Sequence, residues 1–140
     1  MSGNLKQSAM RLLITLLALY GLRVARTASS NIRHVRKEAA AGNHRAKQHF
    51  TQTRYARLFG PSNSDLGMVY YALVALCAAC GLIRQRLVLT ALRLASAATL
   101  VVSLYLLWAL LFRLRARCTI CLKGHFLNAA IFIALLYRAP

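Results

Sequence analysis

Two thiols, a lysine and an imidazole follow one another in the stretch RCTICLKGHFLN, residues 117–128. Cys118 and Cys121 form a Cys-x-x-Cys pair, a spacing that suits either a redox-active disulfide or two metal ligands. An apolar run follows and continues to Tyr137. The pair is therefore predicted to stand at the N-terminus of a helix, where the helix dipole favours the thiolate form of a cysteine.

The surroundings of this pair favour redox chemistry. Arg115, Arg117 and Lys123 add positive potential, which also favours a thiolate. Cysteines spaced i, i+3 on a helix close a disulfide only with strain or with an irregular first turn. Such a pair suits a disulfide that opens and closes during a reaction better than a structural cross-link.

The polar residues of the stretch share one helix face. Cys118, Cys121, His125 and Asn128 follow one another at spacings of 3, 4 and 3, which places them in one stripe. Polar groups at membrane depth tend to face the interior of a bundle. We therefore expect a pocket with the thiols at its mouth and the imidazole and amide deeper inside, although interfacial residues without chemistry remain an alternative.

A zinc site is the other alternative for this stripe. Cys118, Cys121 and His125 would supply three ligands, and a histidine from the long loop would supply the fourth. The candidates for that fourth ligand are His34, His44 and His49.

A second Cys-x-x-Cys pair, Cys77 and Cys80, stands in the small-residue segment ALCAACG. Cysteines in such a segment pack as small apolar side chains where helices approach closely. We expect the two pairs to lie roughly 15–20 Å apart in depth, from the rise of 1.5 Å per helical residue. They are then too distant to share a metal ion or a disulfide.

Four apolar blocks dominate a chain that is 59% hydrophobic, with a mean hydropathy of +0.50. They cover residues 9–25, 66–83, 94–112 and 118–137 of the 140, and a membrane span needs roughly 17–25 such residues. The expected fold is a single all-α membrane domain, an antiparallel bundle of four transmembrane helices. A cleaved signal peptide is the alternative for the first block, although no small-x-small cleavage motif follows it cleanly.

The charge is strongly positive, with 19 Lys and Arg against two acidic residues. These cations border apolar blocks, which favours anionic lipid or an acidic partner over nucleic acid. Their distribution places the long loop, residues 26–65, and the Cys118 end on the cytosolic, matrix or stromal side.

Two helix caps are expected in this long loop. A basic surface helix is predicted within it, capped near Ser29–Asn31 and broken at Gly42–Asn43. The second span is expected to be capped by Asn63, Ser64 or Asp65.

In order and spacing, the blocks resemble the vitamin K epoxide reductase (VKOR) family over residues 11–137. The segments that carry the resemblance are RLLITLLALYGLRV, YARLFGPSNSDLGMVYY, and SLYLLWALLF leading to RCTICLKGHFLN. The resemblance implies a four-helix membrane bundle around a quinone pocket. Electrons would pass between the Cys-x-x-Cys of the fourth helix and a quinone or its epoxide.

The resemblance also implies roles for individual residues. Cys121 corresponds to the thiol that faces the quinone, and Cys118 to the one that exchanges with an outside thiol. Asn63 corresponds to an asparagine that hydrogen-bonds the quinone oxygen, and His125 stands where many members have a tyrosine donor. The implied quinone-binding positions are Asn63, Ser62, His125 and Asn128.

The chain departs from the family pattern in its long loop. Members usually carry a second cysteine pair there, and the expected positions near Ala39–Ala40 and Ala46–Lys47 hold none. A thioredoxin-like partner would then have to reach Cys118 directly.

The expected function is that of a thiol–quinone oxidoreductase acting on a vitamin K-like or ubiquinone-like quinone, without a metal. The alternative is a catalytically inactive VKOR-fold subunit of a larger membrane complex. The family normally exposes this side to an oxidising compartment whereas the cation count points the other way, so the endoplasmic reticulum and an organellar membrane such as the mitochondrial inner membrane both stay open.

Overall fold

The computed structural model describes residues 2–42, 62–113, 115 and 118–137, and those residues fold almost entirely as helices. The four main helices are α1 (Ser2–Ala40), α2 (Asn63–Ala79), α3 (Arg86–Trp108) and α4 (Thr119–Tyr137). A 3₁₀ turn, η3 (Leu82–Arg84), links α2 to α3, and a π-helical turn, η4 (Ala109–Arg113), extends α3.

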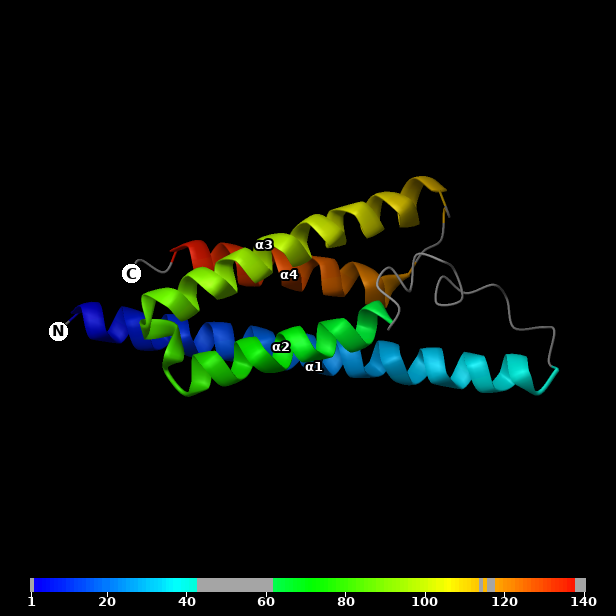
Figure 1. Ribbon diagram of the computed structural model, residues 1–140, viewed down its shortest axis with the longest axis horizontal. Helices are drawn as coiled ribbons and strands as arrows, with labels where there is room; N and C mark the ends of the chain where they lie inside the picture. The colour runs from blue at the N-terminus through cyan, green and yellow to red at the C-terminus, as the bar shows by residue number, and fades with distance from the viewer. Residues whose placement is uncertain (1, 43–61, 114, 116–117, 138–140) are drawn as a thin grey trace.

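The helices form an antiparallel bundle in which α1 occupies the central position. It packs against α2 on one side and α4 on the other, and α3 packs on α4. In Figure 1, α1 and α3 run in one direction and α2 and α4 in the other. The start of α2 and the start of α4 consequently lie at the same end of the bundle, and the end of α2 lies at the opposite one.

Three helical stretches in the described part of the chain are long and apolar enough to cross a membrane. They lie within Gly3–Glu38, Arg86–Arg113 and Thr119–Tyr137. The fourth apolar helix, α2, has 17 residues and is shorter. The protein is therefore a helical membrane protein, and the expectation that all four helices span the bilayer stays a prediction.

Helix α1 is longer than the sequence suggested. It continues without interruption through Ser29–Asn31, where a cap for a separate surface helix was predicted, so that prediction is wrong. The reason is that the serine hydroxyls do not cap: Ser29 donates to the Asp65 carboxylate at 2.8 Å and Ser30 to the Thr27 carbonyl at 3.0 Å. The helix ends just before Gly42, which adopts a left-handed conformation with φ 80°.

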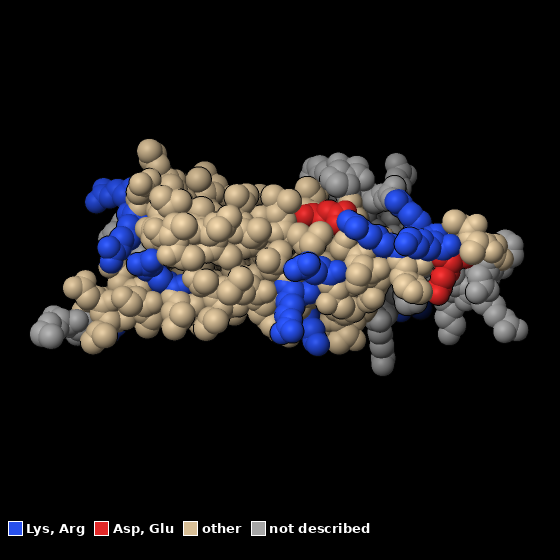
Figure 2. All heavy atoms as spheres, turned by 90° about the horizontal axis from the view of Figure 1, so that it is seen from below, with Lys and Arg blue, Asp and Glu red and all other residues tan. Residues whose placement is uncertain are grey.

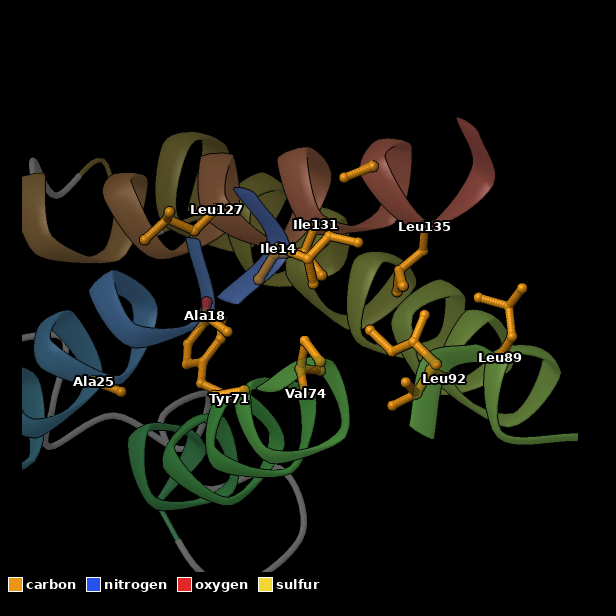
Figure 3. Close-up of a cluster of buried hydrophobic side chains, with 14 residues drawn as sticks. Ile14, Ala18, Ala25, Tyr71, Val74, Leu89, Leu92, Leu127, Ile131 and Leu135 are labelled. Atoms are coloured by element: carbon orange, nitrogen blue, oxygen red, sulfur yellow. The ribbon is translucent and has the colours of Figure 1, made fainter. Parts of the chain in front are cut away.

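The core lies where α1, α2 and α4 meet, and Leu89 and Leu92 of α3 extend it, as Figure 3 shows. Ile14, Val74 and Ile131 come from the three helices and are fully buried there. Gly21 of α1 lies directly against the ring of Tyr71, so that a Cβ on this glycine would come within 2.6 Å of the ring. This close approach lets α2 pack tightly on α1.

Each end of α2 is capped by side chains. The Ser62 hydroxyl accepts the Asp65 backbone N–H at 3.2 Å, so Ser62 is the cap and the prediction that Asn63, Ser64 or Asp65 fills this role is wrong. The serine precedes the helix and reaches its third residue, the usual capping geometry. At the other end, the Arg11 guanidinium donates to the carbonyls of Ala78 at 3.4 Å and Ala79 at 3.1 Å.

Candidate active site

Cys118 and Cys121 are joined by a disulfide at the start of α4. Their Cα atoms are 5.3 Å apart, within the usual disulfide range of about 4.4–6.8 Å. Cys118 precedes the first helical residue, Thr119, and its carbonyl accepts the Leu122 N–H at 3.1 Å. Cys118 is therefore the residue just before α4, and the disulfide links it to the first turn of the helix.

The sulfur of Cys118 takes the place of a helix cap. It accepts the backbone N–H of Cys121 at 3.3 Å, as a serine or aspartate oxygen does at other helix starts. Both cysteines are half-buried. Reduction would leave the Cys118 sulfur beside the Cys121 N–H at a helix start, the setting that stabilises a thiolate.

The second cysteine pair is different, and one expectation about it is wrong. Cys77 is half-buried and packs against the core, as predicted for a small apolar residue. Cys80 is exposed and does not pack between helices, because α2 ends at Ala79 and Cys80 follows as its C-cap. Both thiols are free, so the two pairs share no disulfide.

Asn128 lies inside the bundle, as expected for the polar stripe of α4. Its amide oxygen accepts the Tyr71 hydroxyl at 2.7 Å and its amide nitrogen donates to the Ser103 hydroxyl at 2.6 Å. The Tyr71 hydroxyl also lies 3.3 Å from the Gly124 carbonyl. Asn128 therefore joins α2, α3 and α4.

Tyr71 and Ser103 were not identified from the sequence. Both are nearly buried, at 4% and 5% exposed. The rule that polar groups within apolar helices face the bundle interior could have found them, but it does not distinguish them from the neighbouring Tyr70. The Tyr70 hydroxyl is instead 2.5 Å from the Ser96 hydroxyl of α3.

Ser62 and Asp65 form a compact polar cluster at the start of α2. The Ser62 hydroxyl donates to one Asp65 carboxylate oxygen at 2.6 Å and the Ser29 hydroxyl to the other at 2.8 Å. These two hydrogen bonds, the one from Ser62 first, lower the pKa of Asp65. Asn63 is the first residue of α2, directly beside this cluster.

His125 lies on α4, one turn beyond Cys121, and is half-buried. No hydrogen bond to its imidazole comes from the described residues. It thus differs from Asn128, whose amide is already engaged on both sides. Asn63 and His125 lie on α2 and α4, whose starts share one end of the bundle (Figure 1).

The arrangement of the described residues offers nothing for a metal. No three His, Cys, Asp or Glu side chains gather there in a way that could hold an ion. The cysteines of the proposed zinc set are joined to each other, and His34 pairs with Glu38 of its own helix at 3.3 Å. His44 and His49 lie outside the described residues.

A comparison with protein families now bears on this geometry. The model of the vitamin K epoxide reductase family matches residues 12–136, nearly the whole chain. The chain belongs to the vitamin K epoxide reductase family. No curated protein and no solved structure matches it significantly. Membership in this family supports a function of the thiol–quinone oxidoreductase type, and the segment that the model matches includes the disulfide of α4.

Proposed function

We propose that the chain is a membrane thiol–quinone oxidoreductase whose redox centre is the Cys118–Cys121 pair. The observation that carries the proposal is the disulfide at the start of an apolar helix, in a chain that matches the VKOR family over residues 12–136. A cysteine pair at this position can meet an aqueous thiol from one side and a lipid-soluble quinone from the other. The substrate would be a vitamin K-like or ubiquinone-like quinone, and the proposal needs no metal.

In the reducing direction, the Cys121 thiolate attacks a ring carbon of the quinone or its epoxide and forms a carbon–sulfur bond. The Cys118 thiolate then attacks the Cys121 sulfur. The disulfide forms, the carbon–sulfur bond breaks, and its electron pair remains on the substrate. With two protons, a quinone becomes a hydroquinone, and an epoxide becomes a quinone and water.

Two of the four candidate quinone-binding residues are better placed than the others to polarise the substrate oxygen. The Ser62 hydroxyl is engaged with Asp65, and the Asn128 amide with Tyr71 and Ser103. His125 has no hydrogen bond from the described residues, and Asn63 begins α2 at the same end as the disulfide. We assign polarisation of the substrate oxygen to Asn63 and His125, and a supporting role to Ser62 and Asn128.

Reduction of a quinone or of vitamin K epoxide by the purified protein, driven by a soluble dithiol, tests the proposal. Cys121→Ala is expected to abolish turnover, because no other thiol stands beside Cys118 to form the disulfide. Cys80→Ala is the matched control, since it removes an exposed thiol of the other pair. Equal turnover in wild type and Cys121→Ala, or none in either, would contradict the proposal.

A second function is favoured by one observation in the sequence. The chain has four cysteines, and the long loop holds none of them. A catalytically inactive subunit of a membrane complex would need no loop pair to relay electrons. Under that alternative the Cys118–Cys121 disulfide resists quinol and thioredoxin-like proteins alike, and alkylation of these two cysteines does not change with either reagent.

An active enzyme without the loop pair needs a partner that reaches Cys118 directly. We propose a thioredoxin-like protein, because the half-buried Cys118 lies outside the helix and at the end of the bundle. Trapping with a partner that lacks its resolving cysteine should give a mixed disulfide through Cys118 and not through Cys80. A glycosylation tag in the long loop would establish which side of the endoplasmic reticulum or organellar membrane this end faces.

A further inference from the structure

A shallow groove of about 210 Å³ lies between α1 and α4, beside the disulfide. Four of its lining residues recur on one face of α1 and two on one face of α4. They are Tyr20, Arg23, Val24, Thr27, Ile120 and Lys123. The groove thus combines two cations with an apolar floor.

The two cations of the groove lack an acidic partner within the protein. Arg23 and Lys123 are both exposed, and the whole chain has only two acidic residues. Asp65 accepts hydrogen bonds from two serines, and Glu38 pairs with His34. Among the described residues nothing neutralises Arg23 and Lys123, so both cations are available to an anionic group from another molecule.

The apolar part of the groove extends away from these cations. Val24 and Ile120 are half-buried in its floor. Because α1 and α4 are antiparallel, the start of α1 and the end of α4 lie on the same side of the groove (Figure 1). Exposed apolar side chains continue along both helices in that direction: Leu12, Leu13 and Leu16 on α1, and Phe126 and Ile133 on α4.

The cations also stand at the level where a lipid headgroup is expected. Arg23 ends the apolar segment of α1, and Lys123 lies near the start of α4. Lys and Arg at the ends of apolar segments reach into the headgroup layer, where they attract anionic lipids. Figure 2 shows Lys and Arg at the left end and over the right half of one face, with a stretch of other residues between.

We propose that the α1–α4 groove binds one anionic phospholipid, with the phosphate between Arg23 and Lys123 and an acyl chain along the apolar floor. A charged head with an apolar tail matches both halves of the groove, whereas an acidic protein segment would match only the cations. The proposal does not depend on thiol chemistry, so it can hold or fail whatever the function of the disulfide.

The test compares lipid retention by native mass spectrometry of the detergent-purified protein. The probes are palmitoyl-oleoyl phosphatidylglycerol and the phosphatidylcholine with the same chains. Wild type should prefer phosphatidylglycerol, and Arg23→Gln/Lys123→Gln should lose about tenfold in affinity for it. Arg36→Gln/Lys37→Gln removes the same charge from exposed positions of α1 outside the groove and should keep wild-type affinity.

A second variant, which keeps both charges, tests the groove even if the double variant fails to fold. Ile120→Trp fills the apolar floor and should also weaken phosphatidylglycerol binding. Wild-type binding by Arg23→Gln/Lys123→Gln, or equal loss in the Arg36→Gln/Lys37→Gln control, would overturn the proposal. So would displacement of the lipid by inorganic phosphate at equal concentration, which indicates a free-anion site, or groove-dependent binding of a poly-glutamate peptide without lipid binding.

Discussion

The chain contains the Cys-x-x-Cys motif twice, and the two copies differ in oxidation state. Cys118 and Cys121 stand at the start of α4 and are joined. Cys77 and Cys80 stand at the end of α2 and are both free thiols. The spacing alone therefore does not determine what a Cys-x-x-Cys pair does, and its position relative to the helix end distinguishes the two copies.

The two helix ends also differ in electrostatics, which bears on the reactivity of the reduced thiols. A helix start presents unpaired N–H groups, which stabilise a negatively charged sulfur, whereas a helix end presents carbonyl oxygens, which do not. At the start of α4 the Cys121 N–H already points at the Cys118 sulfur at 3.3 Å. At the end of α2 the Arg11 guanidinium is hydrogen-bonded to the carbonyls of Ala78 and Ala79.

Thiol labelling gives the largest expected contrast between the pairs. A maleimide added to the oxidised protein in mild detergent should label Cys80, which is exposed, and leave Cys118 and Cys121 unmodified. After a dithiol and denaturant all four cysteines of the chain should react. Peptide mass spectrometry measures the label at each cysteine. Labelling of Cys118 before reduction would contradict the proposed difference between the pairs.

The packing of α2 on α1 is expected to give the next largest effect when it is disturbed. Gly21→Ala would place a Cβ within 2.6 Å of the Tyr71 ring, and overpacking of this kind costs about 1–3 kcal/mol of unfolding free energy. Thermal unfolding in detergent measures the loss. Gly124→Ala is the control, because no atom lies within 4 Å of its added Cβ, and it should lose no stability.

Displacement of Tyr71 should loosen the backbone at the start of α4 more than at the end of α2. Its hydroxyl bonds Asn128 and Gly124, both on α4. We therefore expect Gly21→Ala to speed hydrogen exchange in the first turns of α4. An equal or larger effect around Cys77 and Cys80 would contradict this reading of the network.

The helices were largely predictable from the sequence and their interior polar contacts were not. The apolar block at residues 118–137 coincides with α4 to within one residue, since lipid-facing and buried residues are both apolar there, whereas α3 begins at Arg86, well before the block at residues 94–112. A helix boundary was wrongly predicted near Ser29–Asn31, because serine caps helices in water but also fits inside a helix when a distant acceptor, here Asp65, takes its hydroxyl. That contact joins residues 36 apart, which no local pattern reveals.

The candidate site was partly predictable for a similar reason. The i, i+3, i+7, i+10 stripe placed Asn128 inside the bundle correctly because helical periodicity is local. Its partners Tyr71 and Ser103 come from two other helices and depend on how those helices pack. For the same reason the spacing could not show that Cys80 would be exposed, since this depends on where α2 ends.

Substitution of Asn128 tests whether this residue of the polar stripe binds substrate or joins the helices to one another. Asn128→Leu removes its bonds to Tyr71 and Ser103, and interhelical hydrogen bonds in membranes contribute about 0.6–1.7 kcal/mol each. We expect a lower unfolding midpoint with little change in the KM for quinone. A large rise in KM at unchanged stability would instead return Asn128 to the substrate-binding residues. Leu127→Met, a volume-conserving change next to it, should alter neither quantity greatly.

The smallest expected effect concerns the carboxylate at the start of α2. Hydrogen bonds from Ser62 and Ser29 lower the pKa of Asp65 below its ordinary 3.8. The stability it contributes is therefore complete above that ordinary value and is lost as the pH falls through the lowered, folded-state pKa. Ser29→Ala should cost about 0.5–1 kcal/mol at neutral pH, at the low end for a bond to a charged group because this carboxylate is partly exposed.

Thermal unfolding of Ser29→Ala and wild type, from neutral pH down to about pH 3, measures this cost. The difference between them should shrink in acid as Asp65 becomes protonated in both. Ser30→Ala is the matched control, since among the described residues the Ser30 hydroxyl bonds only a carbonyl of its own helix. It should show a small effect that does not vary with pH. A pH-independent loss in Ser29→Ala would mean that packing of the buried Ser29, and not its bond to Asp65, stabilises this end of α2 against α1.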